Sequence, residues 1–201
     1  MRILNPSAAF DCLFIARHLQ HQNGSFSVPE LHVFGYLACL LWLYREQPIS
    51  DWDYTFVGTE LGAPFSQDID TAVNEFLEHG LFHRFHERLQ MTELASKRLQ
   101  SYESLALNSE RIEYLYASCA STSALSVGMV CTALANEPEL KRANMIPASR
   151  QLLEELAQSQ LYLQFNVLHK LFSERSSDLR LPAVTWLSAL YSSGLPDMVV
   201  A

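Results

Sequence analysis

The stretch Ser66–Thr92 reads SQDIDTAVNEFLEHGLFHRFHERLQMT, and it predicts most of the fold of the first half of the chain. Its first part is an amphipathic helix, because apolar residues recur three or four positions apart. These residues are Ile69, Ala72, Val73, Phe76 and Leu77. Gly80 ends the helix, the runs Leu81–His83 and Leu89–Met91 predict two short strands, and Thr92 begins a new helix. The expected order is therefore helix, hairpin, helix.

That order is typical of the second half of a winged-helix domain, a fold that usually reads DNA with its helix. The charge of this helix argues against that use here. Ser66–His79 contains four carboxylates and no lysine or arginine; the carboxylates are Asp68, Asp70, Glu75 and Glu78. An acidic helix is repelled by a groove that is lined with phosphates. We therefore expect a winged-helix scaffold that faces protein partners.

The composition of the chain agrees with this expectation. Hydrophobic residues make up 49% of the 201 residues and charged residues 18%, which predicts a well-packed core of one domain or two small ones. The net charge is −8, and residues 1–105 alone contain 7 basic and 13 acidic residues. This excess of acid argues against non-specific binding of nucleic acid by the isolated chain.

The remaining pattern is helical. Asn5-Pro6 and Ser27, followed by Glu30, are helix starts, and the longest predicted helix covers Ser149–Phe172. Residues 51–57 do not distinguish a short helix from a strand, although we favour a helix. The predicted fold class is mainly α with a small β-hairpin, with a winged helix-turn-helix domain at 1–105 followed by an all-α helical, partner-binding domain at 106–201.

No segment predicts a membrane or secreted protein. The N-terminus lacks the charged and apolar regions of a signal peptide, and the uncharged run Leu31–Tyr44 is shorter than the roughly 20 residues of a membrane span. The cysteines occur in apolar helical contexts without CxxC spacing, which indicates buried, reduced thiols; they are Cys12, Cys39, Cys119 and Cys131. We expect a cytoplasmic protein.

Motifs that carry chemistry are missing from the sequence. None of the glycines lies in a GxGxxG or GxxxxGKS pattern, and there is no GxSxG and no HExxH. The triplet His79, His83 and His86 spans a helix end, a strand and a turn, so its rings should diverge rather than share a metal. We therefore expect no enzymatic activity, no cofactor, no metal and no small-molecule substrate.

Two groups of residues are candidate contact sites. In the hairpin, Arg84, His86 and Arg88 are possible contacts to DNA phosphate, although Glu87 among them also fits an ordinary mixed-charge hairpin. Aromatic residues are possible anchors of a partner interface, with packing in the core as the alternative. These residues are Trp52, Tyr54, Phe56 and Phe65 in the first half and Tyr162, Phe165 and Trp186 in the second. The second-half helices are apolar on more than one face, which favours burial against another subunit.

Several runs resemble small winged-helix proteins of bacterial defence operons. The runs are Tyr36–Tyr44, Pro48, Trp52–Phe56, Gly62–Ser66, Phe76–Phe82 and Leu89–Thr92. Together they span about residues 5–105 and are similar to the middle, accessory component of ABC-three-component systems, which include Lamassu-type defence. The resemblance implies a non-catalytic adaptor whose partners are an SMC-like ATPase and an effector, often a nuclease, encoded in the same operon. DNA would then be contacted only indirectly or through the wing.

Other functions fit part of the pattern. A dimeric winged-helix transcriptional regulator would use the same fold together with the basic residues Arg84, Arg88, Lys97 and Arg98. An antitoxin would bind protein as the adaptor does and differ only in its partner.

Overall fold

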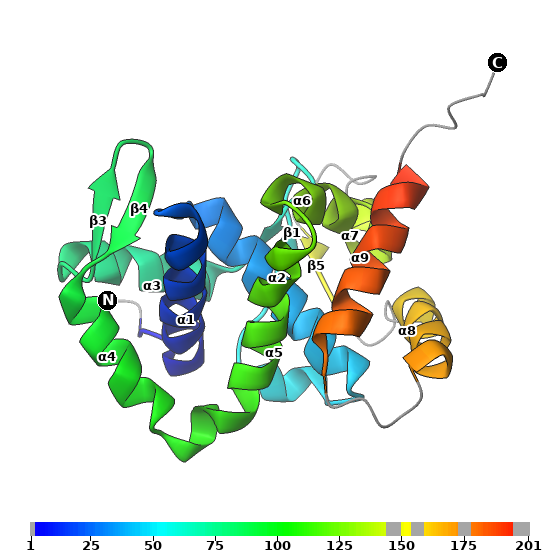
Figure 1. The fold of residues 1–201 in the computed structure, drawn as a ribbon, viewed down its shortest axis with the longest axis horizontal. Coiled ribbons are helices and arrows are strands. Elements are labelled where there is room, and N and C mark those ends of the chain that lie inside the picture. The colour runs from blue at the N-terminus through cyan, green and yellow to red at the C-terminus, as the bar shows by residue number, and fades with distance from the viewer. Residues whose placement is uncertain (1–2, 144–149, 154–158, 173–177, 195–201) are drawn as a thin grey trace.

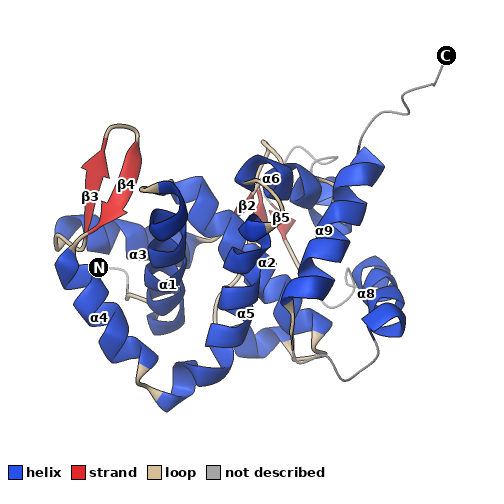
Figure 2. Ribbon diagram, viewed as in Figure 1, coloured by secondary structure: helices blue, strands red, loops and turns tan. Residues whose placement is uncertain are grey.

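The computed structural model describes residues 3–143, 150–153, 159–172 and 178–194, and this part of the chain is mainly helical (Figures 1 and 2). The α-helices are α1 Pro6–Asn23, α2 Val28–Tyr44, α3 Gln67–Glu78, α4 Glu93–Glu103, α5 Ser109–Ala120, α6 Val127–Ala135, α7 Pro138–Ala143, α8 Ser159–Phe172 and α9 Arg180–Gly194. Short 3-10 helices are η1 Ile49–Trp52, η2 Ala106–Asn108 and η3 Ser121–Ser123. The strands are β1 Val57–Gly58, β2 Pro64–Phe65, β3 Phe82–Phe85, β4 Arg88–Met91 and β5 Arg150–Gln151. The predicted class, mainly α with a small hairpin, is confirmed.

The first two helices begin where the sequence predicts. The side-chain oxygen of Asn5 accepts hydrogen bonds from the backbone N–H groups of Ser7 and Ala8 and so caps α1. Ser27 and Glu30 form a capping box at the start of α2, in which each side chain accepts from the other's backbone N–H. From Leu31 to its end α2 is buried, and it lies in the middle of the molecule (Figure 1).

The segment from α3 to α4 folds as helix, hairpin and helix. The apolar face of α3 is buried, and Gly80 takes a left-handed conformation with φ +66° that turns the chain out of the helix. Strands β3 and β4 then pair antiparallel, from Phe82 opposite Met91 to Phe85 opposite Arg88. This hairpin projects at the end of the molecule that also carries α3 (Figure 1).

The two predicted domains share one core. Helix α5 packs against α1 and α2, and the Ser118 hydroxyl donates a 2.7 Å hydrogen bond to the Phe34 carbonyl oxygen of α2. The Tyr36 hydroxyl donates to the Glu137 carboxylate at 3.0 Å, another contact between the halves. Because one cluster of buried apolar residues runs through both halves, the predicted division after residue 105 does not separate two independent cores in the described part of the chain.

The predicted helix Ser149–Phe172 is wrong in its first part. Arg150 and Gln151 form β5, which pairs antiparallel with β1, and the Leu152 N–H donates to the Phe56 carbonyl oxygen at 2.8 Å. Long-range backbone pairing thus overrides the local helical pattern. Residues 149 and 154–158 lie outside the described residues, and α8 covers the rest. We expected a short helix within residues 51–57. Only Asp51 and Trp52 are helical there, as the end of η1, and Val57 begins strand β1.

None of the described helices is by itself long and apolar enough to cross a membrane. The segments Ala106–Ser123 and Val127–Ala135 reach the required length and composition only together, and the chain bends by 113° between them.

Candidate protein-interaction surface

The outer face of α3 carries acid. Ile69, Ala72, Val73 and Phe76 point into the core, which leaves the polar residues of the helix on the other side. Gln67, Asn74 and Glu78 are exposed there, and Asp68, Asp70 and Glu75 are partly exposed. Since α3 contains no lysine or arginine, a phosphate brought to this face would meet carboxylates and uncharged amides but no cation.

The three residues predicted to contact phosphate have different environments. Arg84 and His86 are exposed on the hairpin, and neither makes an ion pair within the described residues. Arg88 is already paired: its Nη2 lies 2.8 Å from the Glu30 Oε2, and its Nε donates to the Ser25 hydroxyl at 2.8 Å. Arg88 therefore fastens the hairpin to the turn before α2, and the prediction that it contacts phosphate conflicts with this pairing.

The tip of the hairpin is apolar as well as basic. Phe85, the last residue of β3, is 47% exposed, and its ring lies against the His86 ring with centroids 4.8 Å apart. An exposed phenyl ring contributes to protein interfaces and gains nothing from a phosphate. The hairpin thus offers an aromatic contact beside one unpaired guanidinium.

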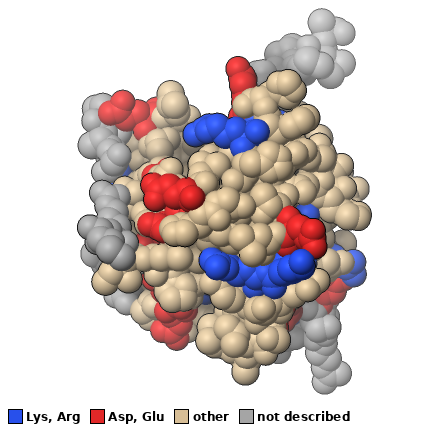
Figure 3. Space-filling model, turned by 90° about the vertical axis from the view of Figure 1, so that its left-hand side faces the viewer, with Lys and Arg blue, Asp and Glu red and all other residues tan. Residues whose placement is uncertain are grey.

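Two of the cations near this surface are accompanied by acids. On α4, the Lys97 amino group lies 2.8 Å from the Glu93 carboxylate, and Arg17 of α1 pairs with Glu103. Figure 3 views this end of the molecule: among the described residues drawn there, the Lys and Arg atoms form a compact upper group and a longer lower band, with acidic and uncharged atoms between the two. The described residues on this face thus present separate basic groups rather than one basic track across it.

The first-half aromatic residues are mostly core residues. Trp52, Tyr54 and Phe56 are only 0%, 6% and 2% exposed, so the interface prediction is wrong for them and the core alternative is confirmed. Phe65 is partly buried, with its ring 4.8 Å from the His32 ring. Burial lowers the pKa of His32 to about 4, and its Nδ1 accepts a hydrogen bond from the Ser66 N–H at 3.1 Å, so this imidazole is neutral and structural.

The second-half aromatic residues join α8 and α9 to α2. Phe165 and Trp186 are buried against each other with ring centroids 5.4 Å apart, and the Tyr44 ring centroid lies 5.6 Å from that of Phe165. The interface prediction is therefore wrong for Phe165 and Trp186, whose rings pack inside the chain. Tyr162 is partly buried on α8 and, with Phe65, keeps accessible surface.

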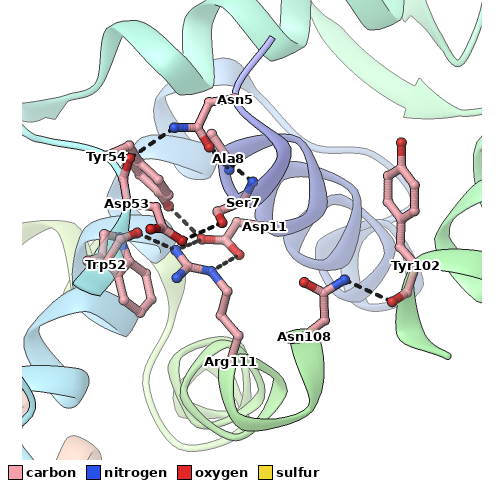
Figure 4. Close-up of polar contacts among 10 residues, drawn as sticks. All are labelled: Asn5, Ser7, Ala8, Asp11, Trp52, Asp53, Tyr54, Tyr102, Asn108 and Arg111. Atoms are coloured by element: carbon pink, nitrogen blue, oxygen red, sulfur yellow. Dashed lines mark hydrogen bonds and ion pairs between the residues drawn. The ribbon is translucent and has the colours of Figure 1, made fainter. Parts of the chain in front are cut away.

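The sequence analysis did not predict a buried ion pair that joins helices α1 and α5 (Figure 4). Arg111 of α5 donates to both oxygens of Asp11 on α1, each at 2.8 Å, and its guanidinium lies 3.7 Å from the centre of the Trp52 ring. The Tyr54 hydroxyl donates to the same carboxylate at 2.6 Å. This Asp11–Arg111 network holds α1, η1 and α5 together. The one available signal was an aspartate on the apolar side of the first helix.

A second buried acid, Glu137, precedes α7. Its carboxylate accepts hydrogen bonds from the backbone N–H groups of Glu139 and Leu140 and from the Tyr36 hydroxyl, so it caps α7. Burial is the largest influence and raises the pKa of Glu137 to about 7, despite these three donors.

The free energy of unfolding should therefore fall as the pH rises and Glu137 loses its proton. The folded state holds the proton more tightly than the unfolded state, so the stabilisation is present below the ordinary pKa of 4.5 and is lost as the pH rises through about 7. We expect the free energy of unfolding to drop by up to about 3 kcal/mol over this window. Urea unfolding at several pH values checks this against Glu137→Gln, which cannot titrate. Parallel pH curves for the two proteins would contradict the prediction.

The described residues show no arrangement suited to metal binding. No group of three or more histidine, cysteine, aspartate or glutamate side chains among them is placed to hold an ion. The four cysteines are free thiols, and of them only Cys131 is exposed, so the prediction that all four are buried is wrong for this one. Comparisons with protein-family models, with curated proteins and with solved structures gave no match for this chain.

Proposed function

We propose that the first half of the chain is a winged-helix domain that binds protein rather than DNA. The order α3, β3, β4, α4 and the antiparallel pairing of the hairpin support the winged-helix assignment. In such a domain α3 occupies the position of the recognition helix and the β3–β4 hairpin that of the wing.

The observation that carries the proposal is the charge of the α3 outer face. Its exposed and partly exposed residues include four carboxylates and no cation, and the wing's Arg88 is neutralised by Glu30. A DNA reader needs the opposite sign at this position, because phosphate contacts supply most of the affinity. A basic or apolar protein surface is the complementary partner.

The sequence resembles the accessory component of ABC-three-component systems, and we therefore assign this surface to an assembly of that kind. We propose a non-catalytic accessory subunit of an SMC-like ATPase complex in bacterial antiphage or antiplasmid defence. In this role the chain bridges or regulates the ATPase and an effector nuclease in the cytoplasm, and contacts DNA only indirectly or through Arg84 of the wing. The role requires no cofactor and no small-molecule substrate.

Co-expression with the neighbouring genes of its operon tests this role. We expect the tagged chain to retain a long coiled-coil ATPase through purification at moderate salt. Recovery of the chain without any operon-encoded partner would contradict the proposal, provided that the ATPase is soluble in the same cells.

A dimeric DNA-binding regulator is the second candidate. It is favoured by Arg84 and Arg98, which are exposed and make no ion pair among the described residues. Two arginines on separate elements are few for a DNA site, since specific complexes use many phosphate contacts. An antitoxin remains compatible with the acidic face, because it also binds protein.

A further inference from the structure

Helix α7 is held in place at both of its ends. Just before its start, the Glu137 carboxylate accepts a 3.0 Å hydrogen bond from the Tyr36 hydroxyl of α2. At its last residue, Ala143 lies so close to β1 that a Cβ added to Gly58 would be 2.6 Å from the Ala143 Cβ. Leu140 between these two points is fully buried. The six residues of α7 thus occupy a tight site between α2 and β1.

The carboxylate at the start of this site is buried without a countercharge. Glu137 is 0% exposed, and its hydrogen-bond donors are the Tyr36 hydroxyl and the backbone N–H groups of Glu139 and Leu140. In the described part of the chain Glu137 has no ion-pair partner. A buried charge is costly unless a charge of opposite sign lies beside it, so the neutral carboxyl fits this site better than the carboxylate does.

The titratable groups around Glu137 do not supply that countercharge. On α2, Cys39 follows Tyr36 by three positions and lies on the same side of the helix. Cys131 is the one titratable residue of α6 and is exposed. On α7 itself, Glu139 is a second buried acid. The cations on the surrounding elements form no ion pair with Glu137; they are Lys141 and Arg142 of α7, Arg150 of β5, and His169 and Lys170 of α8.

A second polar group of α7 is incompletely satisfied. Arg142 pairs with Glu139, three positions before it, and its Nε is buried without an acceptor among the described residues. A buried donor without a partner is unfavourable. The packed position of α7 is therefore less stable than that of a helix whose polar groups are all paired, whatever the charge of Glu137.

We propose that α7 is a pH-sensitive switch, which stays packed against α2 and β1 while Glu137 is protonated and detaches locally when Glu137 ionises. Detachment lets water reach the carboxylate and so removes the cost of the buried charge. A helix of six residues is not stable in water by itself, so α7 unwinds when it leaves its site.

The pH range of the switch follows from the two positions of α7. Burial, the largest influence, raises the pKa of Glu137 to about 7 in the packed position, whereas detachment returns it towards the ordinary value of 4.5. The packed position holds the proton more tightly, so detachment becomes more favourable as the pH rises from 4.5 to about 7 and then levels off. From pH 5 to pH 8 the equilibrium constant for detachment should rise roughly 70-fold.

Detachment changes the junction between the two halves of the chain. Helix α7 contacts α6 and α8, and its detachment exposes the buried side chains of Leu140 and Ala143. The β3–β4 hairpin and α7 lie on opposite sides of the molecule (Figure 1). The switch is therefore independent of the proposed function, because it is measured on the chain alone and does not involve the α3 face.

Hydrogen exchange of the full chain, followed by NMR between pH 5 and pH 8, tests the proposal. After correction for the intrinsic exchange rates, the protection factors of the α7 amides should fall roughly 70-fold over this range. They should stay constant in Glu137→Gln, which cannot ionise. Glu110→Gln is the matched control, because Glu110 is an exposed acid on α5, and it should keep the wild-type pH dependence. The same pH dependence in Glu137→Gln as in the wild type overturns the proposal.

Urea distinguishes local detachment from unfolding of the whole chain. A local opening exposes little surface, so low concentrations of urea should leave the exchange of the α7 amides unchanged. The amides of α2 lie in the middle of the molecule and should exchange faster as urea is added. If the α7 and α2 amides have equal protection factors and the same urea dependence, α7 does not detach by itself and the proposal is wrong. That result would leave the proposed role of the α3 face untouched.

A steric variant tests the packed position without changing a titratable group. Gly58→Ala places a methyl group against Ala143 and should lower the protection of the α7 amides even at pH 5. In the wild-type chain, Glu137 is protonated at that pH while α7 is packed. Unchanged protection of α7 in Gly58→Ala would contradict the contact with β1 on which the switch depends.

Discussion

Replacing Asp11 with alanine is expected to lower the free energy of unfolding by about 3–5 kcal/mol. The change leaves Arg111 with its side chain only 6% exposed and without a countercharge, and it also removes the acceptor of the Tyr54 hydroxyl. Domains are stable by only about 5–15 kcal/mol, so this loss leaves a marginal protein. Urea unfolding followed by circular dichroism measures it.

Two control variants show whether the loss of stability comes from leaving a buried charge without a partner or from breaking an ion pair of any kind. Glu103→Ala breaks the partly exposed ion pair of Arg17 and should cost no more than about 1 kcal/mol. The double variant Asp11→Leu with Arg111→Met should lose less than Asp11→Ala, because apolar side chains of similar volume do not leave a buried charge unpaired. Equal losses for Asp11→Ala and Glu103→Ala would contradict the account of the network.

The second large effect is expected at the outer face of α3. Asp70→Lys, Asn74→Lys and Glu78→Lys together place three cations along one side of the helix, where the residues are exposed or partly exposed. Like charges placed against a basic partner cost several kcal/mol, so retention of the ATPase should fall by more than about tenfold. The same variant should gain affinity for duplex DNA, with a slope of log affinity against log salt of about −2.7.

A matched variant shows whether position or total charge matters. Ser109→Lys, Glu110→Lys and Glu113→Lys on α5 change the net charge by the same amount, and all three residues are exposed. The α5 variant should retain the ATPase as the unmodified chain does. If both variants lose the partner equally, the α3 face is not the binding surface.

Local signals in the sequence predicted local structure well. The caps at Asn5 and Ser27, the amphipathic α3, the left-handed Gly80 and the hairpin all depend on residues within a few positions of each other. The acidity of α3 was also readable, because a helix with one buried side must expose its other residues.

Long-range contacts could not be predicted in the same way. Gln151 lies in a strand because Val57 offers it a backbone partner almost a hundred residues away. Arg111 covers the ring of Trp52, and Arg88 is paired with Glu30. Such pairings leave no periodic pattern in a single sequence. This is why the burial of five predicted interface residues and the pairing of Arg88 with Glu30 were not foreseen; the five are Trp52, Tyr54, Phe56, Phe165 and Trp186.

The exposed face of α8 was anticipated only in general terms. The second-half helices have apolar residues on more than one side, but the sequence does not say which side packs inward. The contacts of Phe165 and His169 with Tyr44 decide this and leave Leu163, Val167 and Leu171 outward.

The most direct test of the central claim, that α3 faces protein and not DNA, is a titration of labelled duplex DNA with the purified full chain at 50 mM salt, followed by fluorescence anisotropy. The account predicts a dissociation constant weaker than about 10⁻⁴ M, the weak limit of ordinary non-specific binders. Saturable binding in the micromolar range that weakens steeply with salt, and that is lost when Asn74 and Gln67 on the α3 outer face are replaced with glutamate, would contradict it.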